Sequence, residues 1–230
     1  MVLAVSAFIP GRKHFMTNSR YPLLAREGRA HVLIVAVATL AVQYYVGTLA
    51  AAPLWLALVF VLQFFRDPPR AIPQAPGLVV CPADGRVIAV GVVEDPYLKR
   101  QALRISVFMN VFNVHSNRMP VAGQVQQIWY HPGSFVNAAL AKASAENERN
   151  AVALRTDDGR DVVVVQVAGL IARRILCYVQ PNQAVARGER YGFIRFGSRV
   201  DVYLPAATRP RISLGDKVKG GCDVLAEFVD

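Results

Sequence analysis

Apolar residues form one long block near the N-terminus. From residue 30 to residue 65 the chain has 36 positions without Asp, Glu, Lys or Arg, and its apolar side chains follow no single stripe. A membrane-spanning helix needs about 20 such residues, and Gly47 and Pro53 interrupt this block near its middle. The pattern predicts a helical hairpin, with arms at about 30–46 and 53–65, that spans or only enters a membrane. Core helices of a soluble fold are the alternative.

Positive charge flanks this block on both sides. Arg26 and Arg29 come shortly before it, and Arg66 and Arg70 follow it. Because segments rich in Lys and Arg stay on the cytoplasmic side, the hairpin is expected at the cytoplasmic face of the cell membrane, as a peripheral or anchored element. The formal net charge of +10 suits an anionic membrane surface. Basic and aromatic residues are not interleaved as a stacking platform requires, so no nucleic-acid partner is expected.

A different pattern begins after residue 66. A proline-rich joint, from Asp67 to Gly77, separates an N-terminal segment, 1–66, from a domain at 67–230. In that domain short β-branched runs are broken by turns, so the expected fold class is mainly β (α+β), with one alanine-rich helix at about 137–148. The expected strands are 78–80, 86–93, 103–109, 123–130, 162–167, 171–179, 192–196, 200–204 and 224–228.

Two glycine-containing turns in this domain, at 81–87 and 119–125, look alike, and the segment 214–221 adds a third glycine turn. Residues 81–87, 119–125 and 214–221 resemble the hairpins of lipoyl- and biotinyl-type domains, which predicts a β-sandwich-like arrangement. No lysine stands at the tip of such a hairpin to carry lipoate or biotin.

Cysteine and histidine are sparse. Cys81, Cys177 and Cys222 lie far apart and in odd number, which gives neither a disulfide framework nor the paired spacing of a zinc site. The chain has four histidines, with no carboxylate or thiol at ligand spacing. No metal is therefore expected.

The dipeptide Gly-Ser occurs twice, at Gly133-Ser134 and at Gly197-Ser198. Only the second lies between two expected strands, where a strained turn would expose the Gly197 carbonyl to the neighbouring hydroxyl. An N→O acyl shift needs that geometry. A hydrolase nucleophile is a weak alternative for Ser198, because the surrounding residues lack the Gly-X-Ser-X-Gly elbow.

Four segments in this order resemble the short bacterial form of the phosphatidylserine decarboxylase family, from about residue 66 to residue 228. They are the segments 82–85, 108–120, 131–135 and 190–205. The resemblance implies a zymogen in which Ser198 attacks the Gly197 carbonyl, the resulting ester eliminates, and Ser198 becomes a pyruvoyl group. A large chain, 1–197, and a small chain, 198–230, would stay together as a heterodimer.

The implied reaction converts phosphatidylserine to phosphatidylethanolamine and CO₂. Loss of CO₂ leaves a carbanion, and no ordinary side chain is a good enough electron sink for it. A covalent pyruvoyl group that forms a Schiff base with the substrate amine supplies that sink. No lysine has an obvious Schiff-base setting, so pyridoxal phosphate is not expected.

Asp84 and His115 are the candidates for acid–base work. A histidine exchanges a proton near neutral pH, and a carboxylate orients and stabilises it when charged. By resemblance, Asp84 assists self-cleavage and His115 serves decarboxylation. The structural alternatives are a turn residue in Ala-Asp-Gly for Asp84 and a hydrogen-bonded polar residue at a strand end for His115.

Arg118 departs from the longer members of the family, which carry a histidine at this place. An arginine stays protonated and is a poor base. Activation of Ser198 would then fall to His115 or His131, while Arg118 would hold the phosphate or carboxylate of the substrate. His131, before Pro-Gly, is alternatively a turn residue. The alternative for the whole protein is a non-catalytic, membrane-tethered β-sandwich that binds a lipid headgroup or a protein.

Overall fold

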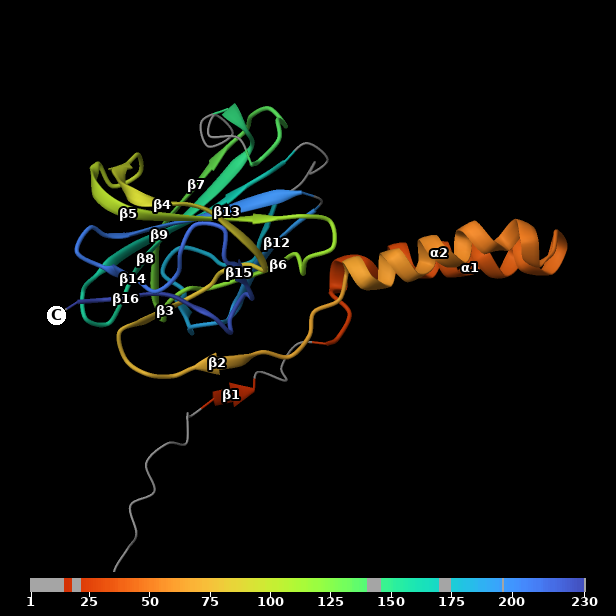
Figure 1. Ribbon diagram of the computed structural model, residues 1–230, viewed down its shortest axis with the longest axis horizontal. Helices are drawn as coiled ribbons and strands as arrows, with labels where there is room; N and C mark the ends of the chain where they lie inside the picture. Colours follow the sequence, from red (N-terminus) through yellow and green to blue (C-terminus); the bar gives the residue numbers. More distant parts are fainter. Residues whose placement is uncertain (1–14, 18–21, 140–145, 170–174, 196, 230) are drawn as a thin grey trace, which may run out of the picture.

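The computed structural model describes residues 15–17, 22–139, 146–169, 175–195 and 197–229. A helical hairpin projects from a β domain that holds both the middle and the end of the chain (Figure 1). The hairpin consists of α1, Arg29–Tyr45, and α2, Thr48–Phe64, and it follows a short 3-10 helix, Arg26–Gly28. Two helices and a predominance of strands confirm the mainly β class.

The turn of the hairpin lies at Gly47. Its φ of +113° belongs to a region that glycine adopts easily, and the backbone N–H groups of Val46 and Gly47 both donate to the Val42 carbonyl oxygen. The prediction that the second arm begins at Pro53 was wrong, because α2 already starts at Thr48. Alanine is the best helix former, so the run 50–52 extends the helix before the proline. Among the described helices, none is both long and apolar enough to cross a membrane.

The β domain is built on one antiparallel sheet of eight strands. Its order is β11-β7-β8-β9-β13-β5-β4-β15, and the sheet curls as it twists (Figure 1). The strands are β4 Gly85–Asp95, β5 Arg100–Met109, β7 Gly123–His131, β8 Arg149–Arg155, β9 Asp161–Val167, β11 Ala184–Val185, β13 Ser198–Pro205 and β15 Lys217–Val218.

Two three-stranded sheets pack against one face of the large sheet. One joins β10 Ile175–Cys177, β12 Arg190–Ile194 and β6 Ser116–Arg118; the other joins β14 Arg209–Pro210, β16 Val224–Glu227 and β3 Leu78–Val80. Strands β1 Phe15–Thr17 and β2 Ala71–Pro73 form a separate pair. The main core lies between the large sheet and the small ones, with Val107, Val164, Val200, Ile194 and Leu225 fully buried. A curled sheet with two small sheets therefore replaces the simple sandwich that we expected.

Successive side chains of a strand point to opposite faces, which decides what each residue of β13 can reach. Val200 and Val202 belong to the main core, whereas Tyr203 packs in a smaller cluster on the other face of the sheet. Ser198 is two positions before Val200, so its side chain lies on the same face of the sheet, toward the main core. Arg199 and Asp201 lie on the opposite face and pair with each other, with Nε of Arg199 2.8 Å from the carboxylate.

Several predicted elements need correction. Strand β8 was missed because alanine, a weak strand former, fills two of its central positions. Half of the predicted helix at 137–148, residues 140–145, lies outside the described residues, and residues 137–139 and 147–148 are not helical. Positions 171–174 of the predicted strand at 171–179 also lie outside the described residues. The other expected strands are present with ends shifted by a few residues, except that residue 196 lies outside the described part of the chain.

Candidate active site

His115 is a buried, neutral histidine at the start of β6. Its Nδ1 lies 3.0 Å from the carbonyl oxygen of Asn113, and because a carbonyl only accepts, Nδ1 carries the proton. Nε2 then holds a lone pair; it is buried and has no hydrogen-bond partner among the described residues. Burial lowers the pKa of His115 to about 4, and the positive charge of Arg66 acts in the same direction. At neutral pH this side chain can accept a proton at Nε2.

We expect the buried His115 to make folding sensitive to acid. Its pKa is 6.5 in the unfolded chain and about 4 in the folded one, so as pH falls from 6.5 to 4 only the unfolded chain binds the proton. That difference lowers the free energy of unfolding by about 3 kcal/mol over this window. Denaturant titrations of uncleaved Ser198→Ala protein, with and without His115→Asn, measure the contribution. Parallel stability curves for the two proteins would contradict it.

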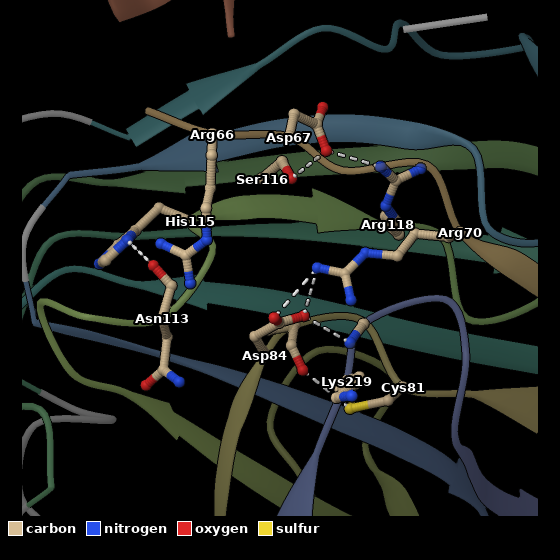
Figure 2. A network of polar contacts seen from close by, with 12 residues as sticks. Arg66, Asp67, Arg70, Cys81, Asp84, Asn113, His115, Ser116, Arg118 and Lys219 are labelled. Carbon is tan, nitrogen blue, oxygen red and sulfur yellow. Dashed lines mark hydrogen bonds and ion pairs between the residues drawn. The ribbon is translucent and has the colours of Figure 1, made fainter. Parts of the chain in front are cut away.

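The Asp84 carboxylate contacts both the proline-rich joint and the C-terminal segment. One guanidinium nitrogen of Arg70 lies 2.9 and 3.0 Å from its two carboxylate oxygens, and the backbone N–H of Gly220 donates to it at 2.8 Å. Figure 2 shows the carboxylate below Arg70, with Arg66, Asn113 and His115 beside it. Asp84 is therefore more than a turn residue, because it connects segments 14 and 136 positions away.

Arg118 lies elsewhere in the same network (Figure 2). Its side chain is buried, with Nη2 2.6 Å from Oδ1 of Asp67, and Nη1 donates to the Gly188 carbonyl oxygen at 3.2 Å. The hydroxyl of Ser116 donates to the same oxygen of Asp67 at 2.9 Å. These contacts tie Arg118 to the joint. Its role in holding substrate stays a prediction that this geometry does not favour.

Gly197 and Ser198 lie where the segment after β12 enters β13. Ser198 pairs with Met109 of β5; its hydroxyl is buried and makes no hydrogen bond with any described residue. Gly197 has φ +60°, a left-handed conformation that glycine adopts without strain. Its carbonyl oxygen packs on Gly169, where an added Cβ would lie 1.5 Å from that oxygen. Exposure of this carbonyl to the Ser198 hydroxyl stays a prediction.

His115 contacts the end of β12, the strand that precedes Ser198 in the chain, whereas His131 lies at another cavity. The backbone N–H of Ile194, the last residue of β12, donates to the His115 carbonyl oxygen at 3.3 Å. His131 ends β7 and lines a cavity of about 600 Å³ with Tyr97, Trp129 and Tyr203. That cavity is on the face of the sheet opposite Ser198.

A second cavity, of about 560 Å³, adjoins Asp84 at the ends of β4, β5 and β15. Asn110 and Asn113 form part of its wall, and both belong to the loop that leads to His115. Asn110 directly follows Met109, the partner of Ser198. Asp84 and the loop that leads to His115 thus share the wall of one cavity. No cluster of metal-ligating side chains occurs in the described part of the chain.

Sequence reasoning missed three groups at this site. Arg66 and Arg70 were interpreted only as a basic flank, although the joint places them beside His115 and Asp84. Gly169 gave no signal, because its contact with Gly197 is set by the fold. Lys217 and Lys219 line the second cavity but lie in a turn that we interpreted only as a hairpin.

Comparison with known proteins agrees with this geometry. The family model for phosphatidylserine decarboxylase matches residues 57–226. A phosphatidylserine decarboxylase proenzyme of Nitrosomonas eutropha is 59% identical over 215 residues, which cover 93% of this chain and 100% of the relative. One from Aromatoleum aromaticum is 61% identical over 211 residues, covering 92% and 98%.

A buried serine hydroxyl next to a left-handed glycine fits the class of self-processing enzymes, and the comparisons show the family. This chain belongs to the phosphatidylserine decarboxylase family. The resemblance inferred from four sequence segments is confirmed.

Proposed function

We propose that this protein cuts itself between Gly197 and Ser198 and uses the pyruvoyl group so formed to convert phosphatidylserine to phosphatidylethanolamine and CO₂. The observation that carries the proposal is the Ser198 hydroxyl, which is buried beside a glycine carbonyl and lacks a hydrogen bond with the described residues. A buried polar atom without a partner is costly, and a catalytic role is one of the explanations for such an atom. The relatives' name, proenzyme, fits a chain that requires processing.

The cleavage can be written with atoms balanced. The Ser198 oxygen adds to the Gly197 carbonyl carbon, the peptide C–N bond breaks, and the chain continues through an ester. Loss of the Cα proton of residue 198 then expels the Gly197 carboxylate. Water enters and ammonia leaves, so that residue 198 ends in a ketone. The products are the chains 1–197 and 198–230, held together by β13 within the large sheet.

The chain's own side chains can manage the protons of this sequence. His115 is neutral and has a free lone pair at Nε2, which suits it to accept the hydroxyl proton of Ser198 and later to protonate the substrate carbanion. Asp84, fixed by Arg70 and Gly220, places a carboxylate at the cavity next to the His115 loop. When formed, the pyruvoyl group supplies the electron sink for loss of CO₂. It would form at the buried Ser198, whose hydroxyl has no hydrogen-bond partner among the described residues.

Intact-mass spectrometry combined with a CO₂ assay tests the proposal. Purified full-length protein is expected to give two chains, the smaller starting at residue 198 with its amine replaced by a ketone, and to release labelled CO₂ from phosphatidylserine carrying the label in its carboxyl group. A single intact chain without a hydroxylamine-reactive carbonyl would refute it.

We propose further that the hairpin of α1 and α2 seats this enzyme on the anionic cytoplasmic membrane surface. Large apolar side chains cover it, with Leu40 58% and Leu56 74% exposed to solvent. Contiguous apolar surface of this size marks an interaction site. The basic residues near its base, including Arg26, Arg29 and Arg66, suit anionic headgroups. No nucleic-acid partner is part of this proposal.

Replacing Leu40 and Leu56 together by Asp is expected to weaken binding to phosphatidylglycerol-containing vesicles by about tenfold or more, since each leucine loses its apolar contact with lipid. Processing, which depends on the β domain, should continue. Vesicle co-sedimentation measures the effect. The matched control is Val92→Asp with Val229→Asp, which adds the same charge at exposed apolar positions of the β domain. Equal weakening in both proteins would speak against a role for the hairpin.

A further inference from the structure

The second cavity carries an unusual pair of like charges. Arg86 of β4 and Lys217 of β15 are direct partners across the antiparallel ladder, so their side chains share one face of the sheet. Lys219 shares that face by alternation, because Val218 between the two lysines is buried and both lysines are exposed. Like charges directly opposite each other destabilise a sheet. An anion bound between them would remove that cost.

The carboxylates of this cavity do not neutralise the three cations. Asp84 pairs with Arg70, and one oxygen of Asp223 accepts the backbone N–H of Lys219 at 2.7 Å. Arg86 uses Nη1 to donate to the Gly215 carbonyl oxygen at 2.9 Å. The ion pairs found among the described residues include none from Arg86, Lys217 or Lys219 to a carboxylate. The cavity therefore offers positive charge to a ligand.

We propose that Arg86, Lys217 and Lys219 bind the phosphodiester of the lipid headgroup. This inference rests on the proposed function and names the part of the substrate that this cavity holds. Arg86 and Lys217 lie on the face of the sheet opposite the Ser198 side chain, because their neighbours Val87 and Val218 point into the main core. The cavity reaches the strand ends at Asn110, which follows the strand partner of Ser198, and at Asn113, which accepts a hydrogen bond from His115. Phosphate oxygens accept charge-assisted hydrogen bonds from ammonium and guanidinium groups.

The site crosses the cleavage point. Arg86 belongs to the segment 1–197, whereas Lys217 and Lys219 belong to the segment 198–230. Headgroup binding therefore requires that both products of cleavage remain associated. In this assignment the exposed Arg86, Lys217 and Lys219 bind the anion, in place of Arg118, which stays in its buried ion pair with Asp67.

Kinetics of the variant Lys217→Ala/Lys219→Ala test the site. In neutral detergent micelles containing phosphatidylserine, we expect KM to rise about tenfold while kcat changes less than twofold, because the phosphodiester contact is equal in the ground and transition states. Mass spectrometry should show complete processing. Lys99→Ala/Arg209→Ala is the matched control: it removes the same charge at positions outside the cavity and should leave KM within about twofold of the unsubstituted enzyme. Lys217→Arg/Lys219→Arg should retain most of the affinity.

Calorimetry with soluble glycerophosphoserine provides a second readout that needs no processing. Uncleaved Ser198→Ala protein should bind it, and adding the two lysine-to-alanine changes should weaken binding about tenfold. Unchanged affinity would overturn the assignment, as would lysine-dependent binding of inorganic phosphate without binding of glycerophosphoserine. If glycerophosphoserine binds through the lysines but unsubstituted protein releases no CO₂, the anion site stands and the proposed function fails.

Discussion

Ser198→Ala is expected to leave the protein as a single chain of 230 residues with no hydroxylamine-reactive carbonyl and no detectable release of CO₂. Alanine has no oxygen to add to the Gly197 carbonyl, so neither the ester nor the ketone can form. The loss of CO₂ release should be at least a thousandfold, roughly, because no other group of the chain supplies an electron sink. Denaturing gels, intact-mass spectrometry and labelled substrate measure the three outcomes.

The control for this experiment is the other Gly-Ser pair. Ser134 follows Gly133 as Ser198 follows Gly197, but its backbone N–H donates to the Glu146 carbonyl oxygen in a different part of the fold. Ser134→Ala should be processed and should release CO₂ like the unsubstituted protein. Cleavage of Ser198→Ala at the same bond would show that another nucleophile acts.

The chemistry of the site could be predicted better than its geometry. Asp84 and His115 were identified from short motifs; in the structure Asp84 lines the second cavity, and His115 is hydrogen-bonded to Asn113 of the same wall. The pairing of Arg118 with Asp67 joins residues 51 positions apart, and no local pattern indicates it. A sequence shows which residues carry charge, but burial and partners depend on which strands meet.

The face of the sheet on which His131 lies is a second feature that the sequence alone could not predict. A strand presents alternate residues to opposite faces, so a shift of one position reverses the assignment. The bulge between Val125 and Gln127 in β7 shifts the alternation by one residue, so the residues after it, including His131, lie on the opposite face from the one that simple alternation predicts. Sequence alone could therefore not decide whether His131 shares the face of Ser198, and the structure places it on the other one.

Most long strands, with the exception of β8, and the presence of both helices were predictable because their patterns are local. Strands β5, β9 and β13 are rich in β-branched and apolar residues, and the apolar block gave both arms of the hairpin. The two-residue strands β11, β14 and β15 have no pattern of their own and form only because a longer strand offers its edge. Strand β15 matters most among them, since it carries Lys217 into the second cavity.

Gly169→Ala is expected to slow self-cleavage by about a hundredfold or more while leaving a folded chain. A Cβ at this position would lie 1.5 Å from the Gly197 carbonyl oxygen, so the scissile peptide must move away from its present place. Misplacement of a reacting group by about 1 Å costs about a hundredfold in rate. Timed gels of freshly synthesised protein measure cleavage, and denaturant titration measures stability on the uncleaved Ser198→Ala background.

Gly133→Ala separates this positioning role from ordinary crowding. Its added Cβ would lie 2.4 Å from the Glu146 carbonyl oxygen, a milder backbone clash that leaves the scissile peptide untouched. If Gly169 positions the carbonyl, Gly169→Ala should slow cleavage far more than Gly133→Ala does, after the difference in their free energies of unfolding is taken into account. If both variants slow in proportion to their stability, Gly169 serves packing alone. The comparison matters because a Cβ added to Gly197 would touch no atom other than those of its chain neighbours, so no other residue fixes it on that side. The orientation of its carbonyl then depends on Gly169, against which the oxygen packs.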